Sequence, residues 1–154
     1  MDAITPIKRA LELQPISHDH HHGLQLCWKI RTGLSRGIAL ERIKKYADWF
    51  YENHLKPHFE LEEKYVFTVL GSNNPLVKHA MLGHSRLHAL FAKKEDIELN
   101  LLCVEAEIQA HIRFEERILF TEIQKIATKE QLEKIKVSHT DAAFVEFEED
   151  VFWL

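Results

Sequence analysis

HIRFEERILF, residues 111–120, lies within a long segment, residues 97–127, whose apolar residues recur every three to four positions. This spacing predicts one amphipathic helix with an apolar face directed at a core. The predicted apolar face consists of Leu101, Val104, Ile108, Ile112, Ile118, Leu119, Ile123 and Ile126. His111 and Glu115 fall on the same face, whereas Glu116 is turned about 100° away and is expected in solvent. Because burying an unpaired carboxylate is costly, we expect a metal ion between His111 and Glu115.

The ten-residue pattern HxxxEExxxF occurs a second time, as HFELEEKYVF, residues 58–67. Two antiparallel helices carrying this pattern would present it from opposite sides of a bundle axis. Glu62 and Glu115 would then face each other and could bridge two metal ions, with His58 and His111 beside them. A single HxxxE pair is common in helices, but its repetition on two helices is not. The repeat therefore predicts a dinuclear metal site.

Further histidines lie in two other segments that are predicted to be helical. His84 and His88 are four residues apart and in register with apolar residues, a spacing that suits chelation of a metal. In SHDHHHGL, residues 17–24, successive side chains fan out by about 100°, so at most one or two histidines can face the core. His20 fits the apolar face best, and His21 is the alternative. A surface position is expected for His18, His22, His79 and His139.

Few helix breakers and no alternating polar and β-branched residues occur, so the sequence predicts an all-α fold. Helices are predicted at residues 17–35, 41–70, 75–91 and 97–127, followed by a short helix that begins with a capping box at Thr128. Pro57 is expected to bend or break the second helix before His58. Gly23 and Gly83, beside proposed ligands, indicate close helix packing, since glycine costs a helix about 1 kcal/mol relative to alanine. Four principal helices with short connections predict an up-down-up-down four-helix bundle.

The 154 residues, of which 45% are hydrophobic and 29% charged, predict a single domain, residues 1–154, with a bundle at about 17–127 and a C-terminal extension at about 128–154. A net charge of -4 without a Lys/Arg cluster argues against a nucleic-acid partner. Because no apolar run approaches about 18 residues, we expect a cytoplasmic protein without a membrane partner. The apolar tail, residues 141–154, is expected to dock on the bundle or on a second copy in a homodimer, with acidic residues such as Glu146 in solvent.

The combined pattern consists of one His in the first predicted helix, HxxxE in the second, HxxxH in the third and a His followed by a carboxylate in the fourth. It resembles the hemerythrin family, specifically the bacterial hemerythrin-like (HHE) domains. The resemblance covers roughly residues 17–127. It implies a bundle that holds two non-haem iron ions with an oxo or hydroxo bridge. Position by position, it implies a ligand set with His84, His88 and His111 on one iron, His20 and His58 on the other, and Glu62 and Glu115 bridging both.

Three histidines on one iron and two on the other would leave an open position, at which O2 or NO could bind. The resemblance thus implies a metal and diatomic-gas binding protein, such as a carrier, sensor, scavenger or iron-handling protein, rather than a classical enzyme. In oxygen-carrying hemerythrins the last carboxylate is an aspartate five residues after its histidine. Glu116, at that position here, is therefore the alternative to Glu115 as bridging ligand.

Other classes of protein fit part of the pattern. A DinB-like thiol transferase would bind one divalent metal through three histidines, with an HxxxH pair among them, and would leave Glu62 and Glu115 without a role. A structural bundle would hold zinc or an empty site. A ferritin-like di-iron site needs ExxH motifs, which the sequence lacks. Nitrogen and oxygen ligands also suit zinc and manganese, so the identity of iron comes from the resemblance.

Overall fold

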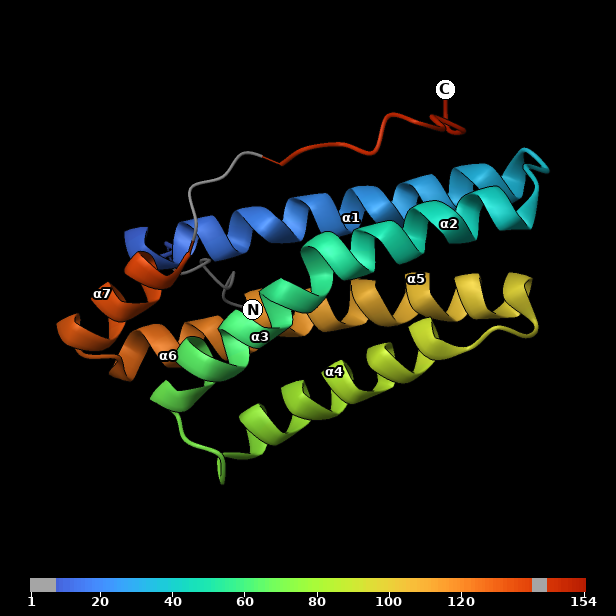
Figure 1. Cartoon of the computed structure of the whole chain (residues 1–154). Coiled ribbons are helices and arrows are strands. Elements are labelled where there is room, and N and C mark those ends of the chain that lie inside the picture. The colour runs from blue at the N-terminus through green and yellow to red at the C-terminus, as the bar shows by residue number, and fades with distance from the viewer. Residues whose placement is uncertain (1–7, 140–143) are drawn as a thin grey trace, which may run out of the picture.

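The computed structural model describes residues 8–139 and 144–154. Every regular element within these residues is a helix, so the predicted all-α class is confirmed for this part of the chain. The helices lie side by side in a bundle (Figure 1). The closest neighbours are α1 (Gln14–Ser35) with α5 (Ile97–Phe114), α4 (Pro75–Ala92) with α5, and α1 with α2 (Leu40–Phe50). None of the described helices is long and apolar enough to cross a membrane.

The second predicted helix is one continuous helical run whose winding changes near Pro57. A π-helical turn, η2 (Tyr51–Leu55), follows α2 and leads into α3 (Lys56–Leu61). Proline has no backbone N–H and its ring crowds the preceding turn, so an α-helix is disturbed at this position. The wider turn accommodates the disturbance, because the N–H of Lys56 donates to the carbonyl of Tyr51, five residues back. The expected break is therefore a π-helical turn.

Both copies of the ten-residue repeat contain a further π-helical turn. The first, η3 (Glu62–Val66), follows α3 and is continued by the short 3-10 helix η4 (Phe67–Val69). The second, η5 (Glu115–Leu119), follows α5 and is continued by α6 (Phe120–Ile126). Each π-helical turn begins at the first glutamate of its repeat. The two copies thus share a backbone irregularity as well as a sequence, and such turns are frequent at functional sites.

The π-helical turn η5 also changes which residues of the predicted apolar face are buried. A π-helical turn holds more residues than an α-helical turn, so it rotates all later side chains about the helix axis. Ile118 is 46% exposed and Ile126 is 58% exposed, although both were expected in the core. Leu119, Phe120 and Ile123 are fully buried in the same region. A helix of constant 3.6-residue period cannot predict this shift.

Helix α1 begins earlier than predicted. It starts at Gln14, directly after a 3-10 turn, η1 (Leu11–Leu13), and not at Ser17. The hydroxyl of Ser17 donates to a carboxylate oxygen of Glu116 at 2.8 Å, so it does not cap the helix. The predicted capping box at Thr128 is confirmed, and it starts α7 (Lys129–Ser138).

Two apolar clusters fill the bundle, and a band of polar residues separates them. On α1, Ile16 belongs to one cluster and Leu26 to the other, and the buried His20 lies between them. On α4, the buried His84 lies between Ala80 and Leu87 in the same way. The polar residues therefore occupy one level of the bundle, with apolar packing on both sides.

The C-terminal segment, residues 144–154, runs back along α1 and α2 toward the turn that joins them (Figure 1). Phe152 is buried in the apolar cluster at that end of the bundle, so the predicted docking on the bundle is confirmed for these residues. Residues 141–143 of the predicted tail lie outside the described residues. The expectation that Glu146 is in solvent is wrong. Its carboxylate accepts hydrogen bonds from Lys29 at 2.6 Å and from Tyr46 at 2.5 Å.

Candidate metal centre

Six of the seven predicted metal ligands meet in the polar band at the centre of the bundle. They form two groups that share both glutamates, and within each group one ligand atom per residue lies within 4.8 Å of the others. The first group is His20, His58, Glu62 and Glu115, and the second is Glu62, His84, His111 and Glu115. All six residues are buried. This cluster could hold metal ions.

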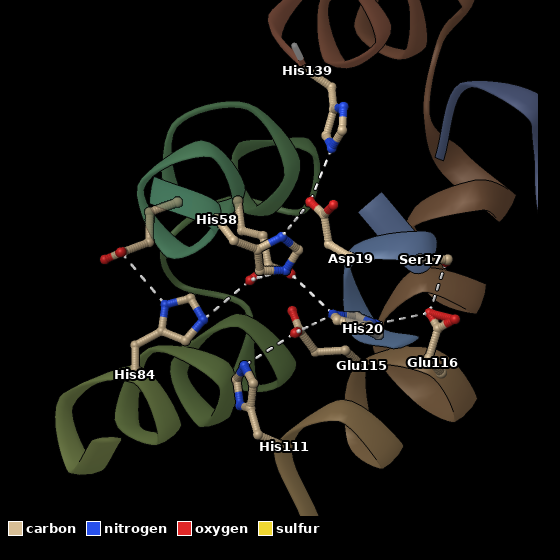
Figure 2. A network of polar contacts seen from close by, with 11 residues as sticks. Ser17, Asp19, His20, His58, His84, His111, Glu115, Glu116 and His139 are labelled. Carbon is tan, nitrogen blue, oxygen red and sulfur yellow. Dashed lines mark hydrogen bonds and ion pairs between the residues drawn. The ribbon is translucent and has the colours of Figure 1, made fainter. Parts of the chain in front are cut away.

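The four imidazole rings present the same atom to the two glutamates (Figure 2). The Nε2 atoms of His58 and His84 each lie 3.3 Å from a carboxylate oxygen of Glu62. The Nε2 atoms of His20 and His111 lie 3.3 and 3.0 Å from a carboxylate oxygen of Glu115. Neutral imidazole nitrogens and carboxylate oxygens are ligands for iron, zinc and manganese. The arrangement therefore gathers metal-binding atoms from both helical hairpins of the bundle, the first running from α1 to η4 and the second from α4 to α6.

The same atoms are buried without a hydrogen-bond partner among the described residues. They are the Nε2 atoms of His20, His58, His84 and His111 and both carboxylate oxygens of Glu62 and Glu115. A buried polar atom left without a partner costs roughly 1–3 kcal/mol, and more if it is charged. Metal ions bound between them would satisfy all of these atoms at once. The donor set thus fits the group that the sequence predicts.

Three outer carboxylates contact the ring nitrogens that face away from the centre. A carboxylate oxygen of Asp19 lies 3.0 Å from Nδ1 of His58. The carboxylates of Glu116 and Glu63 lie 3.4 Å from Nδ1 of His20 and of His84, respectively. Metal-binding histidines commonly donate their second ring N–H to such a group, which fixes the orientation of the ring. This arrangement is visible in Figure 2, in which Asp19 and Glu116 flank the centre.

The sequence prediction missed the role of these outer carboxylates. Glu116 was expected in solvent, but it is partly buried between His20 and Ser17. The sequence predicted no role at the centre for Glu63 or Asp19. The sequence does carry a signal, since the pattern HxxxEExxxF repeats the second glutamate as faithfully as the first. In both copies the first glutamate faces the centre and the second contacts a histidine.

The contacts of the two repeats follow an approximate two-fold relation. Glu63 of the first repeat contacts His84 on α4, and Glu116 of the second contacts His20 on α1. The final phenylalanines behave in the same way, because the ring centroid of Phe67 lies 5.3 Å from that of His84 and the centroid of Phe120 lies 5.5 Å from that of His20. Both phenylalanines are buried in the same apolar cluster.

Close helix packing at the two glycines is borne out by the structure. A Cβ atom at position 83 would lie 2.5 Å from Nδ1 of His111, and a Cβ atom at position 23 would lie 3.0 Å from Cδ1 of Ile112. Gly83 therefore leaves the space that the His111 ring occupies. Gly23 lets α1 approach α5 next to His20.

His88, the seventh predicted ligand, belongs to neither group. Its Nδ1 atom is hydrogen-bonded to the hydroxyl of Tyr51, whose ring stacks on Phe91 at 4.4 Å between centroids. The structure thus places two histidines beside each end of the glutamate pair. The resemblance implied three histidines at one end and two at the other. His20 rather than His21 is in the cluster, since the side chain of His21 is exposed.

Without a cation, the charges of the cluster perturb one another. Burial raises the pKa of Glu62 well above its usual range, and the adjacent Glu115 raises it further. Burial also favours neutral Glu115, but contacts with His111, Glu62 and His20 outweigh it and keep its pKa well below the usual range. Burial alone would lower the pKa of His20, yet Glu115 and Glu116 raise it to about 9. Such strong perturbation in a buried cluster is typical of functional sites.

Comparison of this chain with models of protein families, with curated proteins and with solved structures finds no match.

A cavity of about 1340 Å³ reaches the centre from one side. Its inner wall includes His20, His58, His111 and Glu115, and its outer wall includes the exposed His18. The described cluster can therefore exchange small molecules or ions with solvent along this cavity. The site thus combines buried nitrogen and oxygen ligands, two shared carboxylates and access from one side. These are the features that a metal-binding site requires.

Proposed function

We propose that this chain is a non-haem di-iron protein of the hemerythrin-like kind, with an up-down-up-down four-helix bundle, that binds O2 or NO. The observation that carries the proposal is that Glu62 and Glu115 belong to both groups of potential ligands. A carboxylate shared by two sets of histidines is the geometry expected of a bridging ligand. A single metal ion would need only one of the two groups.

In this proposal the chain holds the two ions through separate histidine pairs. His20 and His58 would bind one iron, and His84 and His111 would bind the other. The outer carboxylates would keep the rings of His20, His58 and His84 in place, so that each Nε2 lone pair points to the ion. His88, which the resemblance assigns to the second iron, would have to move closer to the centre than its contact with Tyr51 now places it.

A diferrous pair, when bound, supplies electrons and an open coordination position to a diatomic ligand. The residues around it control access. The cavity borders His20 and His58 of one pair and His111 of the other, so a small ligand could reach the centre from this side. The buried rings of Phe67 and Phe120 pack on His84 and His20 and belong to the apolar cluster next to the centre. Its role as a carrier, sensor or scavenger of O2 or NO, or as an iron-handling protein, would depend on its partners in the cell.

The proposal is tested by loading the metal-free chain with ferrous iron without oxygen, counting metal per chain, and recording absorption spectra before and after exposure to air or NO. Two irons per chain, with visible bands that appear on exposure and bleach when the gas is removed, are expected. Glu62→Ala and Glu115→Ala should each abolish binding of the pair, whereas Glu98→Ala, an exposed change on α5, should bind as the wild type.

Two results would overturn the proposal. One tightly bound divalent metal that survives both glutamate substitutions would favour a mononuclear thiol transferase. Two zinc ions that resist replacement by iron, with no response to O2 or NO, would favour a structural site.

A further inference from the structure

Seven of the eleven histidines of the chain line the cavity that leads to the centre. Three of them, His20, His58 and His111, are proposed ligands of the centre. The other four, His18, His22, His54 and His139, have no place in it. Passage of O2 or NO requires only space and apolar walls. A wall with four additional imidazoles is instead suited to a ligand that imidazole binds, and the commonest such ligand is a divalent metal ion.

The outermost pair has the spacing of a chelate. His18 and His22 are four residues apart on α1, and their ring centroids are 5.2 Å apart. Two imidazoles at this spacing on one face of a helix can bind the same metal ion. His18 is exposed and His22 is half-buried, so the pair lies where the cavity meets solvent. The ring of His21 lies next to both, with centroids at 6.0 and 5.7 Å.

Further along the cavity, two imidazole nitrogens are buried without a partner among the described residues. They are Nε2 of His54 and Nδ1 of His139. Leaving such atoms without a partner is unfavourable. Both residues line the cavity, although the two nitrogens themselves have almost no accessible surface. His139 also contacts Asp19 at 2.9 Å, and the same carboxylate oxygen of Asp19 lies 3.0 Å from His58. Figure 2 shows His139, Asp19 and His58 in contact one after another, so polar groups of the cavity wall continue to the buried cluster.

We propose that this cavity is the uptake path for the metal ions of the dinuclear centre, and that His18 and His22 form a weak capture site for a divalent metal at its mouth. This inference rests on the proposed function, because it assumes a metal centre at the inner end. A capture site at the mouth raises the local concentration of metal and holds it in the cavity. Since only two protein ligands are involved, the ion is bound weakly enough to move inward to the buried cluster.

The capture site is tested by titrating the metal-free full-length chain with Co²⁺ and measuring the number of bound ions by calorimetry. The wild type is expected to bind two cobalt ions tightly and a third more weakly. His18→Gln combined with His22→Gln should lose only the third. The control is His79→Gln, which removes an exposed histidine of α4 outside the cavity and should keep all three ions.

Several outcomes would overturn the capture site. It is wrong if the wild type binds no third ion, or if the third ion persists in the double variant. If the wild type binds only a weak ion and the double variant loses it, the capture pair stands and the proposed dinuclear function fails. The two ideas are thus separated in one titration.

The path itself is tested by the rate of loading. At limiting Co²⁺, the tight sites should fill several-fold more slowly in the double variant than in the wild type, with the same final number of tight ions. His79→Gln should load at the wild-type rate. Equal rates in all three proteins would overturn the uptake path. Because both substituted side chains lie at the surface end of the cavity, circular dichroism should show an unchanged fold.

Discussion

Glu116 lies with its carboxylate 3.4 Å from Nδ1 of His20, on the side of the ring that faces away from Glu62 and Glu115. Glu63 stands in the same relation, at the same distance, to His84. In both cases the outer carboxylate holds the ring so that the opposite nitrogen faces the shared glutamates. Each copy of the repeat therefore contributes one glutamate to the centre and one to the orientation of a histidine on the other hairpin.

Truncation of these outer carboxylates should weaken metal binding without removing a ligand. Glu116→Ala and Glu63→Ala are each expected to lower the affinity for metal by about 10- to 100-fold, because the ring they orient gains freedom and its nitrogen becomes less basic. Competition with a chelator of known affinity measures the effect. Glu116→Gln should recover part of the loss, since its amide oxygen can still accept a hydrogen bond. Wild-type affinity in Glu116→Ala would contradict the positioning role, and Glu98→Gln serves as the unaffected control.

A methyl group at position 83 should damage the centre while leaving the helix intact. The Cβ of Gly83→Ala would lie 2.5 Å from Nδ1 of His111, so the ring must move away from its place beside Glu115. We expect loss of one of the two metal ions, measured by metal analysis. Overpacking costs about 1–3 kcal/mol, which the higher helix propensity of alanine offsets by about 1 kcal/mol, so the protein should still fold.

The matched control for that substitution is Gly23→Ala. Its Cβ would lie 3.0 Å from the end of the Ile112 side chain, which can change rotamer. We therefore expect both metal ions to be retained. If the two alanine variants lose metal equally, the special role of Gly83 is disproved.

The all-helical fold was predictable because its signals are local. Apolar residues at helical spacing, the turn at Gly71 and the capping box at Thr128 each depend on residues close in the sequence. The inward direction of Glu62 and Glu115 was predictable for the same reason, since helix periodicity places a polar residue on an apolar face. Membership of the hemerythrin family stays a prediction.

Other features depend on contacts that periodicity does not contain. The π-helical turn η5 moved Ile118 into solvent, and a constant helical period cannot anticipate it. His139 was expected at the surface but contacts Asp19, because α7 packs on η1 and η3. Glu146 is held by Lys29, which lies more than a hundred residues earlier in the chain. In each case the deciding partner is distant in sequence.

The metal-free protein should lose stability as the pH rises from 6.5 to about 9. The pKa of His20 is raised from 6.5 to about 9 by Glu115 and Glu116, against the effect of burial. A group that binds its proton more tightly in the folded state stabilises the protein at low pH, and this contribution is lost as the pH rises through the folded-state pKa. The raised pKa of Glu62 acts in the same direction.

Calorimetric melting of the metal-free chain across this pH range measures the effect. His20→Gln should flatten the pH dependence, because it removes one of the groups with a raised pKa, which also include Glu62 and His84. Metal-loaded protein should also show a flatter profile, since bound metal replaces the proton on His20. A melting temperature of the metal-free wild type that rises with pH over this range would contradict the prediction.

Glu146 should anchor the C-terminal segment far more strongly than Asp150 does. Lys29 is only 6% exposed, and Glu146 provides it with a carboxylate at 2.6 Å, whereas Asp150 pairs with the exposed Arg42. Glu146→Gln leaves the buried ammonium without its counter-charge, so the free energy of unfolding should fall by about 1.5–3 kcal/mol in urea titrations. Asp150→Asn, in the same segment, should cause a much smaller loss because its ion pair is in solvent. Replacing both partners, as Lys29→Met with Glu146→Leu, should restore most of the stability, because no unpaired charge remains beside the core. Equal losses in Glu146→Gln and Asp150→Asn would mean that the buried ion pair does not anchor the segment.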